Sequence, residues 1–107
     1  MRIIVPGGAG DMGSVAVADL AETEGVGQVT IADRNVEAAE ALCARLSGSR
    51  ARLDVCEIDA NNHNALVEAL RGYDVAASAL GPFYKYEPKL IRAAIEAGVN
   101  YISICDD

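Results

Sequence analysis

Three glycines at a fixed spacing are the residues of this sequence with the most specific chemistry. Gly8, Gly10 and Gly13 follow the pattern G-x-G-x-x-G, between a strand-like apolar run at residues 2–5 and a helix-like stretch that starts near residue 14. Glycine within a strand or helix costs roughly 0.5–1 kcal/mol relative to alanine, so such a cluster requires a reason. At a strand-to-helix turn, Gly8 is expected to allow the tight turn, Gly10 to let a pyrophosphate approach the backbone, and Gly13 to bring helix and strand together.

The start of the following helix supplies the charge that would hold such a group. Freed backbone amides and the positive end of the helix dipole, which begins near Asp11, favour an anion at this turn. A glycine-rich turn that binds nothing is the alternative interpretation. The predicted contacts with the pyrophosphate of a dinucleotide are Gly8, Gly10, Asp11, Met12 and Gly13.

Asp33 and Arg34 bear on which dinucleotide binds. Asp33 ends a second apolar strand, twenty residues after Gly13, where a carboxylate accepts hydrogen bonds from the adenine ribose hydroxyls. Asp33 could instead cap the next helix, although Asn35 already fits that role. A carboxylate repels a 2′-phosphate and favours NAD, whereas the neighbouring guanidinium of Arg34 can pair with one. We therefore expect NAD or NADP, with NAD slightly favoured.

Two later strand ends complete the predicted cofactor site. The turn Asp59-Ala60-Asn61 follows the third strand and is expected to border the adenine ring, although a solvated turn is the alternative. Leu80, Gly81 and Pro82 end the fourth strand, beside the first. Ligands of doubly wound sheets lie in the crevice where the strand order reverses, so these residues are expected to pass close to the nicotinamide ribose.

The remaining reactive side chains do not suggest a catalytic or metal site. His63 lies beside an expected helix cap, and Tyr84 and Tyr86 fit a packing role better than a substrate contact. No acid/base pair of carboxylates, metal-ligand cluster or nucleophile elbow is recognisable, and the catalytic residues stay unknown. The cysteines, predicted to be reduced and mostly buried because their number is odd and no C-x-x-C occurs, are Cys43, Cys56 and Cys105.

The elements that must position these residues alternate between short apolar runs and helical stretches. Strands are expected at residues 2–5, 29–32, 52–58, 75–80 and 101–104, and helices at 14–24, 35–46, 62–70 and 88–98, the last opened by Pro88. Strands joined through helices are parallel, and right-handed crossovers give an α/β, doubly wound, three-layer fold with the order 3-2-1-4-5. The half-polar strand at 52–58 fits an edge.

Composition limits the class of protein. The chain has 107 residues, enough for one domain, and 51% of them are hydrophobic and 23% charged, as in a folded domain. A net charge of −7 argues against a nucleic-acid partner. No apolar run approaches the ~18 residues of a membrane span, and residue 1 leads straight into a strand, so we expect a cytoplasmic protein with no membrane contact.

Four segments together resemble a known family. The stretches "GGAGDMGS", "ADRN", "SALGPFYKY" and "AAIEAGVNYISICDD" resemble the amino-terminal nucleotide-binding domain of the saccharopine dehydrogenase family. The resemblance implies NAD(P)-dependent hydride transfer to or from a C–N bond of an amino-acid-derived substrate. It also implies an amino-terminal fragment of a longer enzyme, because family members carry a further substrate domain. The cofactor contacts that it implies are Gly8, Gly10, Gly13, Asp33, Gly81 and Pro82.

Two other interpretations remain open. Read as Gly7-x-x-Gly10-x-x-Gly13, the loop resembles that of extended short-chain dehydrogenases and sugar epimerases, which carry a later Tyr-x-x-x-Lys pair that these residues lack. The segment "EIDANNHNAL" faintly resembles the NAD-binding regulatory domains of potassium channels and transporters. The fifth strand would expose an edge, through which a homodimer could form.

Overall fold

A computed structural model describes residues 1–80 and 83–104 of this chain, the side chains of residues 83 and 84 excepted. The elements are β1 (Arg2–Pro6), α1 (Asp11–Ala21), β2 (Gln28–Asp33), α2 (Val36–Arg45), β3 (Arg52–Glu57), α3 (His63–Leu70), β4 (Val75–Ser78), α4 (Phe83–Ala97) and β5 (Asn100–Ser103). All neighbouring strands are parallel, in the order β3-β2-β1-β4-β5. The predicted doubly wound α/β fold is therefore confirmed.

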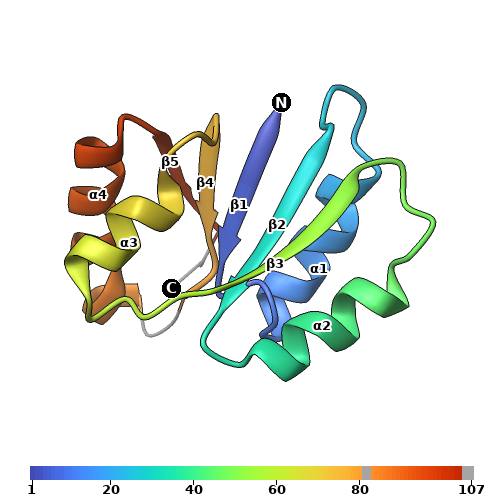
Figure 1. Cartoon of the computed structure of the whole chain (residues 1–107), viewed down its shortest axis with the longest axis horizontal. Coiled ribbons are helices and arrows are strands. Elements are labelled where there is room, and N and C mark those ends of the chain that lie inside the picture. Colours follow the sequence, from blue (N-terminus) through green and yellow to red (C-terminus); the bar gives the residue numbers. More distant parts are fainter. Residues whose placement is uncertain (81–82, 105–107) are drawn as a thin grey trace.

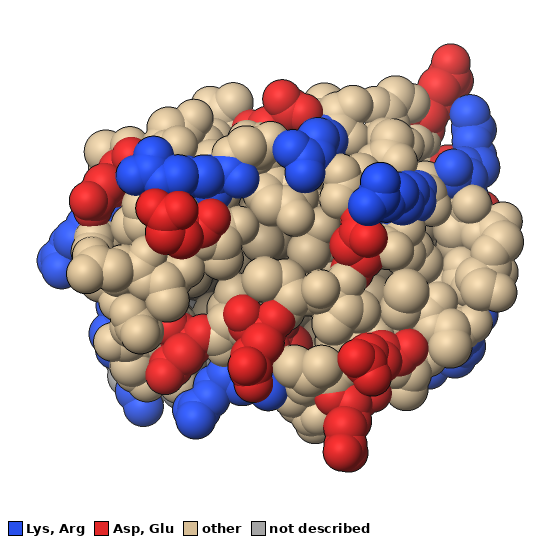
Figure 2. All heavy atoms as spheres, in the orientation of Figure 1, with Lys and Arg blue, Asp and Glu red and all other residues tan. Residues whose placement is uncertain are grey.

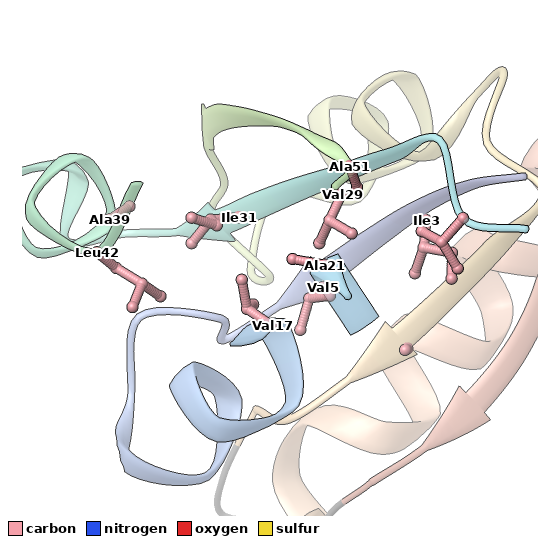
Figure 3. Close-up of a cluster of buried hydrophobic side chains, with 11 residues drawn as sticks. Ile3, Val5, Val17, Ala21, Val29, Ile31, Ala39, Leu42 and Ala51 are labelled. Carbon is pink, nitrogen blue, oxygen red and sulfur yellow. The ribbon is translucent and has the colours of Figure 1, made fainter. Parts of the chain in front are cut away.

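The sheet separates two apolar clusters. On one face Val5 of β1 and Ile31 of β2 pack with Val17 of α1, all fully buried (Figure 3). On the other face Ile4 of β1 packs with Leu66 of α3 and Leu90 of α4. Successive residues of β1 thus serve opposite faces, as the two-residue period of a strand requires. Helices α1 and α2 cover one face and α3 and α4 the other, which gives three layers (Figure 1).

Side chains of two asparagines begin the helices α2 and α3. Asn35 Oδ1 accepts a hydrogen bond from the backbone N–H of Ala38 at 3.1 Å, and Asn62 Oδ1 accepts one from Ala65 at 3.2 Å. Each bond satisfies one of the amides that a helix start leaves without an intrahelical acceptor. The cap expected at Asn35 is confirmed, and of Asn61 and Asn62, the two candidates for capping the third helix, Asn62 is the cap.

The start of α4 differs from the prediction. The helix begins at Phe83, and Pro88, which was expected to open it, lies inside. A proline inside a helix removes one backbone hydrogen bond and is more common in the first turn. For this reason the sequence predicted that the helix starts at Pro88. Burial of Leu90, Ala93 and Ala94 against the sheet offsets that cost. The other boundaries differ by a few residues at an end, as at α1, which starts three residues early because Gly10 is its N-cap.

The strand β3 lies at one edge of the sheet, as its alternating pattern predicted. Its residues are half-buried or exposed, and its apolar side chains Leu53 and Val55 pack against the cluster under α1 and α2. The expected strand reached Ile58, whereas β3 ends at Glu57 and Ile58 is buried in the following turn. In the part of the chain that the structure describes, no helix is long and apolar enough to cross a membrane.

Candidate functional site

The loop between β1 and α1 is held by close backbone contacts. Gly7 has a φ of 77°, its N–H donates to the carbonyl of Ala32 at 2.7 Å, and a Cβ there would lie 2.9 Å from the carbonyl carbon of Ala79. The left-handed residue of the turn is therefore Gly7, and Gly8, predicted to allow the tight turn, closes it by donating its N–H to the Val5 carbonyl at 3.0 Å. Gly8 must be glycine for lack of space, because a Cβ would lie 2.9 Å from the Val5 carbonyl oxygen.

Gly13 and Gly10 meet opposite surroundings. A Cβ at Gly13, in the first turn of α1, would lie 2.1 Å from the carbonyl oxygen of Gly7, so the helix approaches the loop as closely as backbone allows. Gly13 thus allows close packing of the helix, but against the loop after β1 and not against the strand for which it was predicted. A Cβ at Gly10 would meet only that same oxygen, at 3.5 Å, which is ordinary contact. The loop is open at Gly10 and closed at Gly13.

The start of α1 has no side-chain cap. Gly10 is its N-cap and accepts no amide bond through a side chain, whereas α2 and α3 are capped by asparagines. The amides of Asp11, Met12 and Gly13 lie in the first turn, where no intrahelical acceptor exists. Asp11 and Met12 are exposed. The positive end of α1 is therefore available to an anion that approaches over Gly10.

Asp33 ties this loop to the start of α2. Its Oδ2 accepts a hydrogen bond from the backbone N–H of Ala9 at 3.1 Å, and its Oδ1 accepts one from Asn35 at 3.0 Å. Asn35 is the N-cap of α2, so Asp33 does not take that role. A carboxylate oxygen has two acceptor positions, which leaves capacity on both oxygens for a ligand hydroxyl.

Five of the predicted residues meet in one groove at the carboxyl ends of β2, β3 and β4. The groove has a volume of about 110 Å³, and its lining includes Asp33, Arg34, Asp59, Ala60 and Leu80. An adjoining cavity of about 400 Å³ shares Arg34 and Asp59. Gly81 and Pro82 lie outside the described residues.

Two lining residues were not predicted as site residues, Ile58 and Tyr86, whereas Asn61 was expected beside Asp59 and Ala60. Tyr86 also packs on the cluster under α4, so it combines the packing role expected for it with a place in the groove. Because the sequence predicted that α4 starts at Pro88, Tyr86 was expected in a loop, whereas it lies within the helix. The apolar spacing of Tyr86, Leu90, Ala93 and Ala94 was the signal that could have placed it on the helix.

Two lysines lie close to the Tyr86 side of the groove. The Nζ atoms of Lys85 and Lys89 lie 5.4 and 5.8 Å from the centre of the Tyr86 ring, and Lys89 also donates to Asn61 Oδ1. Figure 2 shows basic and acidic side chains interspersed on the face in view, without a continuous basic stripe. This arrangement fits a small anionic ligand better than a nucleic acid.

Two polar contacts lie outside the groove. His63 Nε2 lies 2.5 Å from Glu96 Oε2, and both side chains are exposed, which gives His63 a partner on the surface of α3 and α4. The Tyr101 hydroxyl donates to Glu87 Oε1, and burial together with Glu87 raises the pKa of Tyr101 well above its usual range. Among the described residues no group of His, Cys, Asp and Glu could hold a metal ion.

This chain is similar in sequence to a known family and in fold to solved structures. Residues 3–106 match the family described as the saccharopine dehydrogenase NADP binding domain. The fold is also that of apo saccharopine dehydrogenase (L-Glu forming) from Saccharomyces cerevisiae, with 24% identity, a TM-score of 0.76, and coverage of 95% of this chain and 21% of that one.

Two reductases have the same fold. Citrobacter sp. triphenylmethane reductase complexed with NADP(H) gives 26% identity and a TM-score of 0.75 over 94% of this chain and 36% of that one. The NADPH-dependent quinone oxidoreductase of Escherichia coli gives 25% identity and a TM-score of 0.73 over 94% and 34%. This chain therefore spans between about a fifth and about a third of the length of these three proteins.

Proposed function

Since this chain belongs to the family described as the saccharopine dehydrogenase NADP binding domain, we propose that it holds the dinucleotide of an oxidoreductase across the carboxyl ends of its strands. The uncapped start of α1 carries this proposal. The pyrophosphate lies over Gly10 and accepts hydrogen bonds from the first-turn amides of Asp11, Met12 and Gly13, where the helix dipole favours its charge. A Cβ at Gly10 would occupy that space.

The rest of the cofactor follows the groove. The adenine ribose lies against Asp33, whose two oxygens keep capacity for its hydroxyls. The adenine lies between Arg34 and the turn at Asp59 and Ala60. The nicotinamide ribose lies beside Leu80, where the sheet order reverses between β1 and β4. When bound, the nicotinamide supplies or accepts a hydride, and the residues of this chain orient it and exclude water from one face.

We assign the phosphorylated form of the cofactor. The sequence favoured NAD on the strength of the Asp33 carboxylate, but that carboxylate already accepts two backbone amides, which lowers the repulsion that it exerts on a phosphate. Arg34 lines both the groove and the adjoining cavity. Among the described residues its side chain has no ion pair, so it is available to a 2′-phosphate. The family description and the NADP(H) complex of the Citrobacter reductase support the same form.

Calorimetric titration of this chain with NADPH and NADH tests both proposals. NADPH is expected to bind more tightly than NADH by about tenfold, since charge-assisted contacts are the stronger ones. Arg34→Gln is expected to weaken NADPH binding until that difference is lost, with a smaller loss of affinity for NADH because Arg34 also lies beside the adenine. Absence of heat with either cofactor at about 1 mM would contradict the dinucleotide site. Equal affinity for both cofactors would contradict only the role of Arg34.

For the whole protein we propose a cytoplasmic enzyme that transfers hydride to or from a C–N bond of an amino-acid-derived substrate. The family match supports this reaction class. The substrate-binding pocket would be formed by residues outside the 107 of this chain. Alone, the chain is expected to bind cofactor and turn nothing over. Assay of the full-length protein with saccharopine-like secondary amines tests this class, and oxidation of none of them would contradict it.

One observation favours a second candidate, a reductase or epimerase of the extended short-chain type. The left-handed backbone of the turn lies at Gly7, and Gly7, Gly10 and Gly13 have the glycine spacing of that class. The Citrobacter and Escherichia coli reductases share the fold at 25–26% identity. Reduction of a quinone or dye by the full-length protein, without activity on amines, would select this candidate. Nothing in the site favours a channel regulatory domain.

A further inference from the structure

A polar cluster lies between β4, β5 and α4, on the face of the sheet that α3 and α4 cover. Tyr101 of β5 is in register with Ala76 of β4, so the side chains of Tyr101 and Ser78 are diagonal neighbours on that face. The Tyr101 hydroxyl donates to Glu87 Oε1 of α4. Burial raises the pKa of Tyr101, whereas hydrogen bonds with Ser78 and Ser103 lower it, which places both serines beside that hydroxyl. The Tyr101 hydroxyl therefore joins α4 to the end of β4.

The cluster reaches the wall of the groove through Ser78. Ser78 Oγ accepts a hydrogen bond from the backbone N–H of Leu80 at 3.3 Å, and Leu80 lines the groove. On its other side this backbone lies against the glycine loop, since a Cβ at Gly7 would be 2.9 Å from the Leu80 nitrogen. The strand end at Leu80 is therefore held between the loop after β1 and the Ser78 hydroxyl.

The Glu87 carboxylate is only partly satisfied. Its Oε2 is buried and has no hydrogen-bond partner among the described residues. The bond that Tyr101 donates to Oε1 is the one hydrogen bond of this carboxylate in the described part of the chain. A buried oxygen without a partner costs stability, so a cluster that keeps one is better explained by what it positions than by what it stabilises.

We propose that Tyr101 is a positioning residue for the nicotinamide half of the cofactor. Its hydroxyl, held by Glu87, fixes Ser78 and through it the strand end at Leu80, beside which the nicotinamide ribose binds. Residues that contact a ligand keep their geometry only where supporting hydrogen bonds hold them, so loss of this hydroxyl weakens that contact. The inference rests on the proposed dinucleotide site.

The adenine half of the cofactor provides an internal reference. Its proposed contacts are Asp33, Arg34 and Asp59, which lie at or just after the ends of β2 and β3. The hydrogen bonds of the two aspartates run to their own turns and to the glycine loop, and none of those described reaches Tyr101. The effect of Tyr101 is therefore confined to the nicotinamide half.

Tyr73 offers a matched control. Its hydroxyl lies 2.7 Å from Thr30 Oγ1, and its side chain is half-buried in the same apolar cluster as Tyr101. Tyr73 comes shortly before β4, at the opposite end of that strand from Leu80. Tyr73→Phe and Tyr101→Phe thus each remove one hydroxyl and its hydrogen bond, and only the second acts on the strand end that lines the groove.

The test is a titration of this chain with NADPH and with adenosine 2′,5′-bisphosphate, which lacks the nicotinamide half. Tyr101→Phe is expected to raise the dissociation constant for NADPH about fivefold, the scale of one neutral hydrogen bond, and to leave that for the bisphosphate unchanged. Tyr73→Phe is expected to change neither. Glu87→Ala is expected to act as Tyr101→Phe does, and Glu87→Gln, which keeps an oxygen acceptor for the Tyr101 hydroxyl, to lose less affinity.

The outcomes separate this inference from the proposed function. A loss shared by NADPH and the bisphosphate, or by Tyr73→Phe, overturns the positioning role, and so does an NADPH affinity that survives both Tyr101→Phe and Glu87→Ala. Equal affinity of the unsubstituted chain for the two ligands overturns this inference and leaves the adenine site in place. Absence of binding of either ligand at about 1 mM overturns the dinucleotide site itself. Thermal unfolding checks the fold of each variant, and the Glu87 pair carries the test if Tyr101→Phe does not fold.

Discussion

Gly10, the N-cap of α1, and Gly13, in its first turn, are glycines for different reasons. At Gly13 a single added carbon would lie 2.1 Å from the Gly7 carbonyl oxygen, so its absence is a condition of the fold. At Gly10 the same carbon would meet that oxygen at 3.5 Å, so its absence is not. The fold does not require glycine at position 10, which is the N-cap of α1 and carries no side-chain cap. The approach of an anionic ligand to the amides of α1 therefore explains why this residue is glycine.

Gly10→Val is expected to raise the dissociation constant for NADPH by about tenfold or more while the free energy of unfolding changes little. The valine methyl groups would occupy the space over the first-turn amides, and φ −77° with ψ 178° is extended backbone that valine adopts readily. Calorimetric titration and urea denaturation measure the two effects. Unchanged affinity would contradict the placement of the pyrophosphate.

Two other glycines supply the controls for Gly10→Val. Gly27 has nothing within 4 Å of an added Cβ, so Gly27→Ala is expected to alter neither binding nor stability. Gly13→Ala is expected to destabilise the chain by about 1–3 kcal/mol or more, because an overpacked site must shift its backbone. A variant at Gly13 that kept full stability would show that the loop can move away from α1.

At the scale of elements, periodicity predicted the strands and their order, but boundaries depended on contacts distant in sequence. The strand order follows from the alternation of strands and helices, which local patterns reveal. Pro88 concealed the first turn of α4, since its cost is offset by burial of Leu90 and its neighbours. The left-handed backbone of Gly7 was not predicted. The crowding that excludes a side chain there comes from Ala79, which follows β4 and is distant in the sequence.

Pro88→Ala is expected to stabilise the chain by about 1–2 kcal/mol. Pro88 lies inside α4 and is exposed, so alanine restores an N–H to the carbonyl four residues earlier without a new clash. Part of the gain is lost because the unfolded chain becomes more flexible. Urea denaturation measures the difference, and a destabilised variant would contradict the helical assignment at this position.

Tyr101→Phe is expected to make the loss of stability at alkaline pH less steep. The pKa of Tyr101 is raised in the folded chain by burial and by Glu87. Above about pH 10 the unfolded chain releases this proton while the folded chain retains it, so the free energy of unfolding decreases as the pH rises. Urea midpoints measured from pH 8 to 11 for both chains provide the test.

The comparison in alkali has a background shared by both chains. Burial and Glu57 raise the pKa of Cys56, so its thiol adds to the loss of stability above about pH 9 with or without the Tyr101 hydroxyl. The difference between the two slopes therefore reports Tyr101. Parallel slopes would mean that the Tyr101 hydroxyl is as accessible in the folded chain as in the unfolded one.

At the scale of the molecule, the sequence predicted which strand ends form the candidate site better than it predicted the contacts between side chains there. The carboxyl ends of parallel strands share one edge, so Asp33, Asp59 and Leu80 were each expected to contact part of one cofactor, and they line one groove. The Lys89–Asn61 contact joins α4 to the turn before α3, between residues 28 positions apart in the sequence. No local pattern specifies such a contact, because it depends on how α3 and α4 pack.

The edge of the sheet at β5 leads to a prediction for the whole molecule. Within the described residues β5 pairs with β4 alone, carries no charged residue over Asn100–Ser103, and exposes 51% of Ile102. An uncharged edge with unpaired backbone groups is a template for pairing with a second strand. We therefore expect a concentration-dependent homodimer through β5, visible by sedimentation equilibrium.

Ile102→Lys is expected to weaken this dimer by about tenfold or more, because two lysines would face each other across the paired edges. Ile95→Lys is the matched control, since Ile95 is 75% exposed on α4 and its replacement changes charge equally without altering the strand. It is expected to leave the association constant unchanged. Monomers at all concentrations up to about 1 mM, or equal effects of the two substitutions, would contradict pairing through β5.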